Sequence, residues 1–316
     1  MLISERIYNS ILERKKKLDS LRPLNKVQLK KLKEEFLVEY IYNSTSMEGN
    51  TLTLNETKLV LHEGITIGGK SLREHLDITN QKEAINYIED FIKEKKTIKE
   101  ADIIRLHRIT LKGISEYWAG RYKTSQNRIV GSRHKTTPPY KVSSEMNNLV
   151  YLISKNPKKY NPIELAAICH HELVRIHPFV DGNGRLARLL CNLILLSKGS
   201  VPIVIRTKER KKYFDFLEKA HFGDLRLFVN FIGLRVEESL IRYISTFVKT
   251  TKENELLPLS LLAKETPYSQ EYLSLLARRG VLPATKINDV WHSSREEIKK
   301  YVQRIKNKYI GIDKNI

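Results

Sequence analysis

The stretch HPFVDGNGRLAR, residues 177–188, combines a histidine, an aspartate, two glycines around an asparagine, and two arginines. Gly182 and Gly184 tolerate positive φ values, so successive backbone N–H groups can curl towards an anion. The dipole of the helix that follows adds to this attraction. Arg185 and Arg188 are three positions apart on that helix and share a face that suits successive phosphates. The stretch therefore indicates a polyphosphate site at the start of a helix.

Two other side chains of this stretch complete a transfer site. Asp181 can supply the single carboxylate that Mg²⁺ usually takes when phosphates and water fill its octahedron. His177 lies at the exit of the preceding helix, where neighbouring positive charge should lower its pKa and keep it neutral as a base near pH 7. Together these residues indicate phosphoryl or nucleotidyl transfer.

The composition narrows the class of protein. The chain has 316 residues and a net charge of +20, which favours polyanionic partners such as ATP, nucleic acid or acidic protein surfaces. Cys169 and Cys191 are its only cysteines and form no CxxC pair, which indicates a reducing compartment. Charges interrupt the N-terminal region where a signal peptide would be apolar, and residues 189–196 are too few to span a membrane. We expect a cytoplasmic protein without a membrane segment.

Helical spacing dominates the chain, so we expect a mainly α fold. Helices are predicted over residues 25–48, 54–63, 80–95, 101–112, 143–154, 162–176, 184–199, 208–220 and 224–248. The second of them starts with a capping box formed by Thr53 and Glu56. Between residues 121 and 141, Ile129 and Val130 beside Gly131 predict a short β-hairpin and a loop.

The opening stretch resembles, without a gap, the HPFx(D/E)GNGRxxR signature of Fic-domain proteins, which transfer AMP from ATP to a hydroxyl side chain of a target protein. The resemblance extends from about Asn43 to Arg235. It implies a helical Fic core in which His177 is the general base for a Ser, Thr or Tyr hydroxyl. Phe179 would anchor the loop, and Asp181 would bind Mg²⁺. The phosphates of ATP would be held by Gly182, Asn183, Gly184, Arg185 and Arg188, with Arg188 at the γ-phosphate.

Two further segments fit the same resemblance. The region 126–132 resembles the Fic flap, a hairpin whose edge pairs with an extended segment of the target; its docking residues would be Gln126, Asn127, Arg128, Ile129, Val130 and Gly131. STSMEGN, residues 44–50, resembles the inhibitory motif (S/T)xxxE(G/N) through Ser44, Glu48 and Gly49. Glu48 would then pair bidentately with Arg188 and exclude productive ATP. The alternative for this segment is an ordinary helix end.

A rival nucleotide site is suggested by GITIGGKS, residues 64–71, which satisfies the P-loop pattern GxxxxGK[ST]. A P-loop needs a buried strand before it, whereas residues 54–63 carry a capped helix. A P-loop NTPase is therefore the weaker enzyme hypothesis. The neighbouring His170 and His171 lack the HExxH order of a zinc protease, so we expect them to be packing residues.

The C-terminal region resembles a small winged helix-turn-helix of the excisionase type. Its first helix would end near Glu265, its second would cover 269–280, and its wing 281–294. Glu271, near the start of the candidate recognition helix, would repel phosphate, so DNA and protein are equal candidates as its partner. The expected domains are a helical region 1–100 with the inhibitory helix, a catalytic core 101–248, a linker 249–258, the winged module 259–305 and a tail 306–316.

The sequence thus predicts a protein adenylyltransferase that uses Mg²⁺ and ATP and is held at low activity by Glu48. A different class stays open, namely a DNA-binding regulator whose Fic core senses nucleotide. The intact His177 argues against pure sensing, because sensing needs no base. The target protein, the transferred nucleotidyl group, a capacity to remove AMP and the oligomeric state, a homodimer included, are left open.

Overall fold

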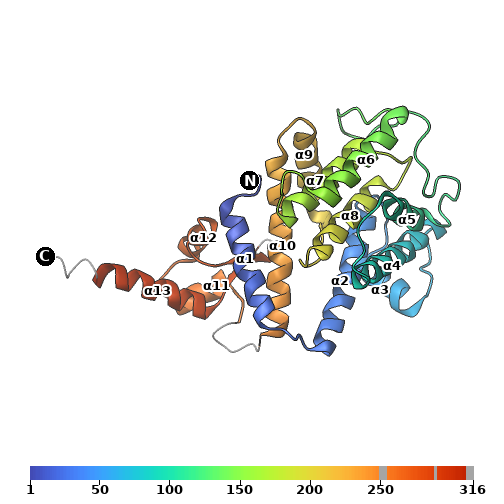
Figure 1. Ribbon diagram of the computed structural model, residues 1–316. Coiled ribbons are helices and arrows are strands. Elements are labelled where there is room, and N and C mark those ends of the chain that lie inside the picture. The colour runs from blue at the N-terminus through green and yellow to red at the C-terminus, as the bar shows by residue number, and fades with distance from the viewer. Residues whose placement is uncertain (249–254, 288–289, 311–316) are drawn as a thin grey trace. The chain divides into compact units, whose positions relative to one another are not determined.

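The computed structural model of the protein describes residues 1–248, 255–287 and 290–310, and helices dominate it (Figure 1). The chain divides into two compact units, Met1–Ile11 with Leu29–Ser239 and Leu12–Gln28 with Leu240–Ile316. None of the helices in the described ranges has the apolar length that a bilayer crossing requires.

Most of the helices predicted up to residue 248 are confirmed to within a few residues. The structure has in this part of the chain α1 (Glu5–Ser20), α2 (Lys26–Ser46), α3 (Leu54–Glu63), α4 (Leu72–Lys93), α5 (Glu100–Leu111), α6 (Pro139–Lys155), α7 (Pro162–Ile176), α8 (Asn183–Ser197), the 3₁₀ turn η1 (Thr207–Glu209), α9 (Arg210–His221) and α10 (Leu225–Phe247). The capping box predicted at Thr53 is present, and Gly64 ends α3 in the left-handed conformation. Helix α1, which the sequence pattern did not single out, is the main addition.

Helix α4 begins at Leu72, well before the predicted start near residue 80. The cause is a second capping box. The Ser71 side chain accepts the Glu74 N–H at 3.3 Å, and Glu74 Oε2 accepts the Ser71 N–H at 2.9 Å. These bonds satisfy backbone donors that a helix start otherwise leaves unpaired. Ser71 is also the last residue of the apparent P-loop pattern.

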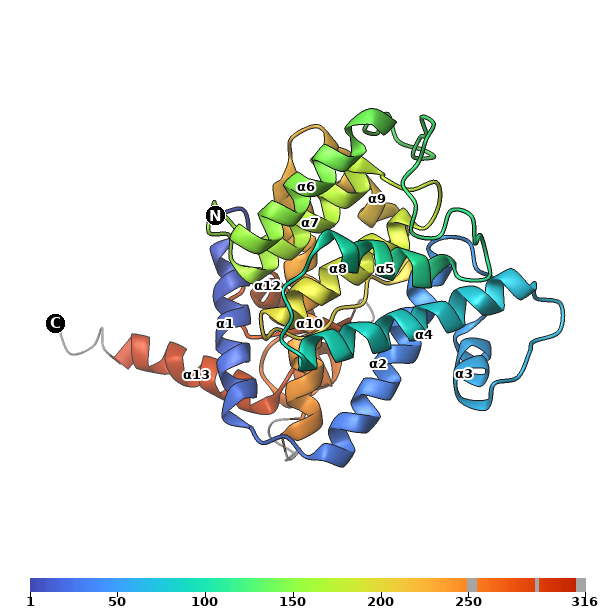
Figure 2. The ribbon, with the colours of Figure 1, turned by 45° about the vertical axis from the view of Figure 1, so that its right-hand side comes forward.

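Helices α7 and α8 lie side by side at the centre of the first unit, and α8 also contacts α4 and α5 (Figure 2). Because α8 is enclosed, its apolar residues face all directions and are buried. The contacts between α4, α5 and α8 also place the N-terminal helices α2 to α4 in one unit with the core. The structure therefore draws no domain boundary near residue 100.

The predicted β-hairpin is wrong, because no strand forms in the described stretch 121–138. The chain does turn where expected, with the Ile129 carbonyl accepting the Ser132 N–H at 3.2 Å. Side chains join the two arms. The Thr136 hydroxyl donates to the Asn127 carbonyl at 2.8 Å, and Gln126 Nε2 donates to the Thr136 carbonyl at 3.0 Å. These bonds occupy carbonyls that a backbone ladder would need.

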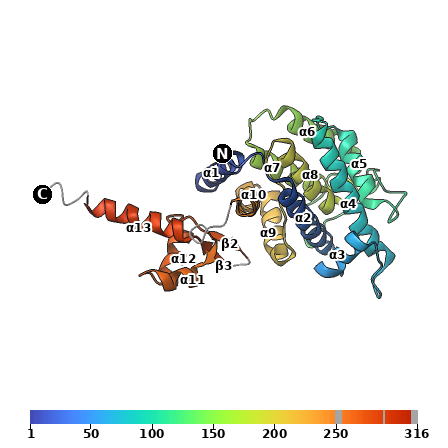
Figure 3. The same ribbon diagram turned by 90° about the horizontal axis from the view of Figure 1, so that it is seen from below.

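The second unit contains β1 (Leu257–Pro258), α11 (Leu259–Leu262), η2 (Ala263–Glu265), α12 (Gln270–Arg278), β2 (Thr285–Ile287), β3 (Val290–Ser293) and α13 (Arg295–Ile310) (Figure 3). The strands form an antiparallel sheet in the order β1-β3-β2. Leu259, Leu262, Leu273, Leu276, Ala277, Leu282, Ile298 and Tyr301 form its core.

Parts of the expected linker 249–258 and tail 306–316 belong to regular structure. Residues 249–254 and 311–316 lie outside the described residues. Leu257 and Pro258 belong to β1, because they pair with Ser293 and His292 of β3. Likewise α13 continues through residue 310.

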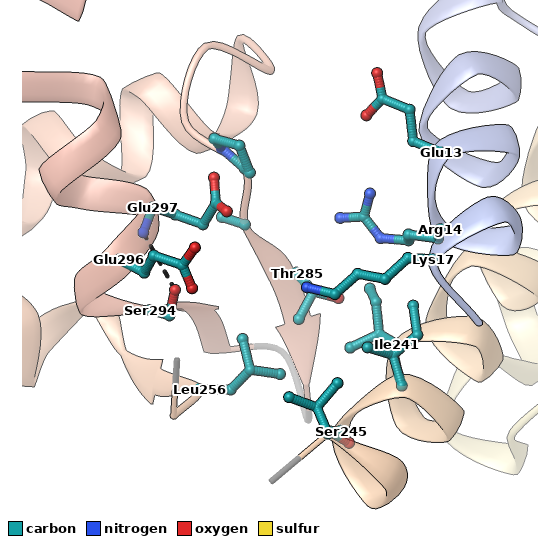
Figure 4. A pocket seen from close by; sticks show the side chains of 14 residues that line it. Glu13, Arg14, Lys17, Ile241, Ser245, Leu256, Thr285, Ser294, Glu296 and Glu297 are labelled. Carbon is teal, nitrogen blue, oxygen red and sulfur yellow. Dashed lines mark hydrogen bonds between the residues drawn. The ribbon is translucent and has the colours of Figure 1, made fainter. Parts of the chain in front are cut away.

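A pocket of about 270 Å³ lies within the second unit, between the ends of α1 and α10 and the β2 and α13 region (Figure 4). Its lining mixes apolar residues such as Ile241 and Leu256 with charged ones such as Lys17 and Glu296.

The buried amide of Asn192 in α8 provides a test of the core. Asn192 Nδ2 donates to the Ile203 carbonyl at 3.0 Å, and its Oδ1 accepts the Ile203 N–H at 2.7 Å. Asn192→Leu would leave both backbone groups buried without partners. We expect the free energy of unfolding to fall by about 2 kcal/mol or more, measured by urea denaturation. Asn148→Leu, at an exposed position of α6, is the control. Equal stability of the two variants would contradict this role.

Candidate functional site

His177 caps the C-terminal end of α7, directly before the loop of the candidate site. Its backbone is left-handed, with φ 50°, and its N–H donates to the Leu173 carbonyl at 3.0 Å. Nδ1 lies 3.3 Å from the Val174 carbonyl, so it carries the proton and leaves Nε2 as an acceptor. Burial lowers the pKa of His177 to about 4, aided by the charge of Lys123 and opposed by the bond to Val174. The sequence predicted the direction, but burial rather than charge is the main cause.

The loop after His177 is anchored by Phe179, as the resemblance implied. Its ring is fully buried and stacks on His107 with centroids 3.6 Å apart. Asn183 Oδ1 accepts the Phe179 N–H at 3.0 Å, and Asn183 Nδ2 donates to the Phe179 carbonyl at 2.8 Å. The Asn183 amide therefore holds the loop in shape, and only its backbone remains for a phosphate.

His107 is a residue of the site that sequence reasoning missed. The Gly120 N–H donates to Nδ1 at 2.9 Å, so the Nε2–H donates to the Asp181 carbonyl at 2.9 Å. Burial lowers the pKa of His107 to about 4, which keeps the ring neutral. No local pattern marks this residue, because α5 brings it to the loop through tertiary packing.

The first turn of α8 faces the site with free backbone donors. Gly182 precedes the helix with φ 80°, and the N–H groups of Asn183, Gly184 and Arg185 have no acceptor within the helix. A Cβ atom at position 184 would collide with Glu48 Oε1. Gly184 therefore allows a carboxylate to lie directly over the helix N-terminus, where the dipole favours an anion.

Arg188 joins the two motifs that lie far apart in the sequence. Its side chain is only 2 % exposed, and Nη2 donates to Glu48 Oε1 at 2.7 Å. Nη2 also donates to the Ser44 carbonyl at 2.8 Å, and Nε donates to Ser44 Oγ at 3.0 Å. The predicted bidentate pair is thus a single bond to Glu48 supplemented by two to Ser44. Gly49 follows with φ 97° and turns the chain away.

The charge of this arginine is retained in spite of its surroundings. Burial disfavours the Arg188 cation, but Glu48 overcomes that effect and raises its pKa. One donor, Nη1, is buried and has no hydrogen-bond partner among the described residues. Among the described residues, Arg185 Nε is likewise buried and has no hydrogen-bond partner. Unpaired buried donors of this kind suit a polyanion.

Asp181 lies at the exposed side of the site between two arginines. Its Oδ1 accepts from Arg185 Nη2 at 3.0 Å, and its Oδ2 accepts from Arg73 Nη2 at 2.7 Å. Burial raises the pKa of Asp181, but Arg185 and the other donors outweigh it, so the pKa is lowered. Arg185 also pairs with buried Asp77. Sequence reasoning missed Asp77 and Arg73, which α4 contributes.

The predicted flap, residues 126–131, is bonded through Asn127 to the loop that follows His177. Asn127 Nδ2 donates to the carbonyl of Phe179 at 2.8 Å and to that of His177 at 3.4 Å, which connects the predicted flap to the loop that follows α7. Gln126 is held on Thr136, whereas Arg128, Val130 and Gly131 are exposed and Ile129 is half-buried.

The P-loop interpretation of residues 64–71 is wrong. The segment follows helix α3 where a P-loop would follow a buried strand. Lys70 Nζ donates to the carbonyl and hydroxyl of Thr51 at 2.9 and 3.0 Å, and so does not face a phosphate site. His170 packs as expected, with its Nε2 3.1 Å from the Tyr213 hydroxyl. Across the described ranges, no group of three or more His, Cys, Asp or Glu residues could hold a metal ion.

Comparison with known proteins gives a consistent result. Residues 97–195 match the Fic/DOC family. The chain is 35% identical over 246 residues to "Protein adenylyltransferase Fic" of Nematostella vectensis, which covers 77% of this chain and 57% of that protein. The chain spans about half the length of the curated relatives it matches.

Two solved structures are similar over most of this chain. A Fic domain containing signaling protein from Bacteroides thetaiotaomicron is 31% identical, with a TM-score of 0.70 over 78% of this chain and 99% of that one. Residues 134–508 of Fic-1 from Caenorhabditis elegans are 32% identical, with a TM-score of 0.70 over 78% of this chain and 74% of that one.

The buried position of His177 predicts its titration. Its folded pKa lies below the ordinary value, so the neutral ring should persist from pH 7 to about pH 5 and gain a proton near pH 4. Below pH 6.5 the unfolded chain binds this proton first, so His177 contributes to a loss of stability on acidification. NMR titration of the ring, assigned with His177→Gln, measures the pKa. Protonation near pH 6.5 would contradict the geometry.

Lys70 provides the matching test of the rejected P-loop. Because its ammonium binds Thr51, we expect Lys70→Ala to keep the ATP affinity of the parent within about twofold by calorimetry. A collapse of ATP binding in this variant would restore the P-loop interpretation.

Proposed function

Since the chain belongs to the Fic/DOC family, we propose that it is a protein adenylyltransferase, which moves AMP from ATP to a Ser, Thr or Tyr hydroxyl of a target protein. The observation that carries this proposal is the meeting of His177, whose Nε2 is free to accept a proton, with the anion-binding start of α8. The names of the relatives support it, because several are called protein adenylyltransferase.

The proposed reaction uses these groups in one displacement. The target hydroxyl oxygen attacks the α-phosphorus of ATP, and the bond from that phosphorus to the bridging oxygen of the β-phosphate breaks. Pyrophosphate leaves with the electron pair, while His177 Nε2 accepts the hydroxyl proton. A base with a pKa near 4 is fully available at pH 7, and proton transfer becomes favourable only as the oxygen bonds to phosphorus.

The phosphates of ATP would bind where the free donors converge. The N–H groups of Asn183, Gly184 and Arg185 line the start of α8. Within the described part of the chain, Arg185 Nε and Arg188 Nη1 are buried and unpaired, and Arg188 Nη1 lies close to position 184. Charge-assisted bonds from these groups would hold the triphosphate and stabilise the leaving pyrophosphate.

Asp181 fits the one-carboxylate arrangement that Mg²⁺ uses with phosphates. Its carboxylate is 44% exposed, and its partner Arg73 is 65% exposed and free to move aside. Mg²⁺ bound there would neutralise charge on the phosphates. Asp181 would hold the metal, and Arg185 would keep that carboxylate oriented.

Glu48 would restrain this activity. Its carboxylate already lies over Gly184 and on Arg188, where a terminal phosphate would be placed. It is attached to the same chain, so its effective concentration is high. We infer that nucleotide must displace Glu48 before the α-phosphate can align with His177.

The winged helix-turn-helix interpretation of residues 259–305 is also a proposal. It is supported by the sequence of helices and the small sheet, in which α12 would be the recognition helix. DNA and protein are both candidate partners. Retention of the full chain on a DNA column, lost in Arg279→Glu, would favour DNA.

His177→Ala tests the chemical role. We expect AMP transfer to fall about a hundredfold or more, while ATP affinity stays near that of the parent because the phosphate donors remain. The measurement is labelling from radioactive ATP, of the protein itself and of lysate proteins, with calorimetry for ATP binding. Labelling at the parent rate would refute the proposed base.

Glu48→Gly tests the restraint. Loss of a charged hydrogen bond worth roughly 1.5 to 3 kcal/mol should raise AMP transfer about ten- to a hundredfold. Arg188→Ala should lower transfer again in that background, because it removes the phosphate donor. Glu63→Gly, which deletes an exposed carboxylate at the end of α3, is the control. Equal rates for the parent and Glu48→Gly at saturating ATP would leave STSMEGN as an ordinary helix end.

A further inference from the structure

The flap and its flanks carry charge of one sign only. Between Glu116 and Glu145 the sequence contains no Asp or Glu, but it has six basic residues, Arg121, Lys123, Arg128, Arg133, Lys135 and Lys141. Surfaces that serve only solubility usually mix both signs. A segment of this charge beside the loop of His177 therefore suits an anionic partner, even in a chain whose net charge is +20.

Some of these cations have structural roles. Lys123 is buried, and its Nζ donates to Asn127 Oδ1 at 2.6 Å and to Thr136 Oγ1 at 3.1 Å. Arg133 pairs with Glu218 of α9 and lies over the Phe222 ring. Arg121 lies over the ring of Tyr117. These contacts fix the loop.

Arg128 and Lys135 differ from the others. Both are exposed, and within the described part of the chain neither has an ion-pair or hydrogen-bond partner. Their sequence neighbours meet across the loop, because Arg128 follows Asn127, Lys135 precedes Thr136, and the Asn127 carbonyl accepts from the Thr136 hydroxyl at 2.8 Å. Asn127 in turn binds the carbonyls of Phe179 and His177, so the segments that carry both cations are attached to the loop of His177.

The loop is held in place before any partner binds. Ser132 and the backbone of Arg133 bind Glu218, and the ring of His134 stacks on His221 with centroids 4.3 Å apart. A surface that is already ordered loses little entropy on binding. Val130, 91% exposed, adds one apolar side chain at the turn.

We propose that Arg128 and Lys135 form a docking surface for an acidic segment of the target protein, with an apolar residue of that segment on Val130. This inference rests on the proposed function and names its substrate class. The ATP-binding arginines are buried and separate, so the two exposed cations are not needed for nucleotide. Two cations beside one apolar side chain match a short peptide with a few carboxylates, whereas nucleic acid usually needs a longer basic track.

The test uses synthetic peptides that contain one Thr and carry Glu, Gln or Lys at the same flanking positions. Their affinity is measured by fluorescence anisotropy, and their kcat/KM for AMP labelling is measured in the Glu48→Gly protein. We expect the Glu peptide to bind roughly tenfold more tightly than the Gln peptide and to be labelled with a similar advantage, which should shrink at high salt.

Arg128→Glu/Lys135→Glu should abolish that advantage and favour the Lys peptide, with no change in KM for ATP. Lys155→Glu/Lys158→Glu is the control, because it reverses two exposed lysines at and just after the far end of α6, about 24 Å along the helix from the flap. If the reversal variant fails to fold by circular dichroism, Arg128→Gln/Lys135→Gln replaces it and should remove the preference without inverting it.

Equal affinity of the Glu and Gln peptides for the parent would overturn the proposal, as would an equal loss in the control variant. Binding of a short oligothymidylate that depends on Arg128 and Lys135, without binding of the Glu peptide, would assign the surface to nucleic acid instead. Peptide binding does not require AMP transfer. Failure of every peptide and lysate protein to be labelled would therefore count against the proposed function, while the anisotropy result would still decide this inference.

Discussion

The buried guanidinium of Arg188 is the constraint on which the site depends. A cation only 2 % exposed must have anionic or carbonyl partners, because leaving it unpaired costs several kcal/mol. Ser44 and Glu48 provide those partners from the end of α2. This requirement fixes α2 against the N-terminus of α8, and it explains why position 184 has no side chain. An anion that replaced Glu48 would have to satisfy the same guanidinium, so in the proposed function Glu48 and nucleotide would exclude each other.

The loop of residues 177–182 is held by hydrogen bonds from side chains to its backbone. Asn183 binds both polar groups of Phe179, His107 binds the Asp181 carbonyl under the Phe179 ring, and Asn127 connects the flap to the same segment. These bonds preserve the left-handed residues at both ends of the loop. His177 can then lie close to the anion site while its Nδ1–H stays on Val174. Preorganisation of this kind is what a transfer reaction requires from its surroundings.

The sequence predicted the parts of the site that are contiguous. A motif within one loop and one helix turn has fixed geometry, so the positions of His177 and Arg188 and the course of α7 and α8 followed from spacing alone. The pairing of Glu48 with Arg188 could be expected only through family resemblance, since nothing local brings α2 to α8. Asp77, Arg73 and His107 escaped notice because helices α4 and α5 deliver them through packing.

The errors have specific physical causes. The pair Ile129 and Val130 beside Gly131 suggested a hairpin, but side chains such as Gln126 and Thr136 occupy the carbonyls that a ladder would use. The capping box of Ser71 and Glu74 sets the true start of α4, and helix α3, standing where a P-loop needs a buried strand, rules out the GxxxxGK[ST] interpretation.

The central claim is that Glu48 and the terminal phosphates of ATP compete for Arg188. Calorimetric dissociation constants of ATP and AMP for the parent and for Glu48→Gly measure this competition directly, because AMP lacks the phosphates in question. The account predicts that Glu48→Gly tightens ATP binding about tenfold or more while AMP binding changes little. An equal change for both nucleotides, or none for ATP, would contradict it.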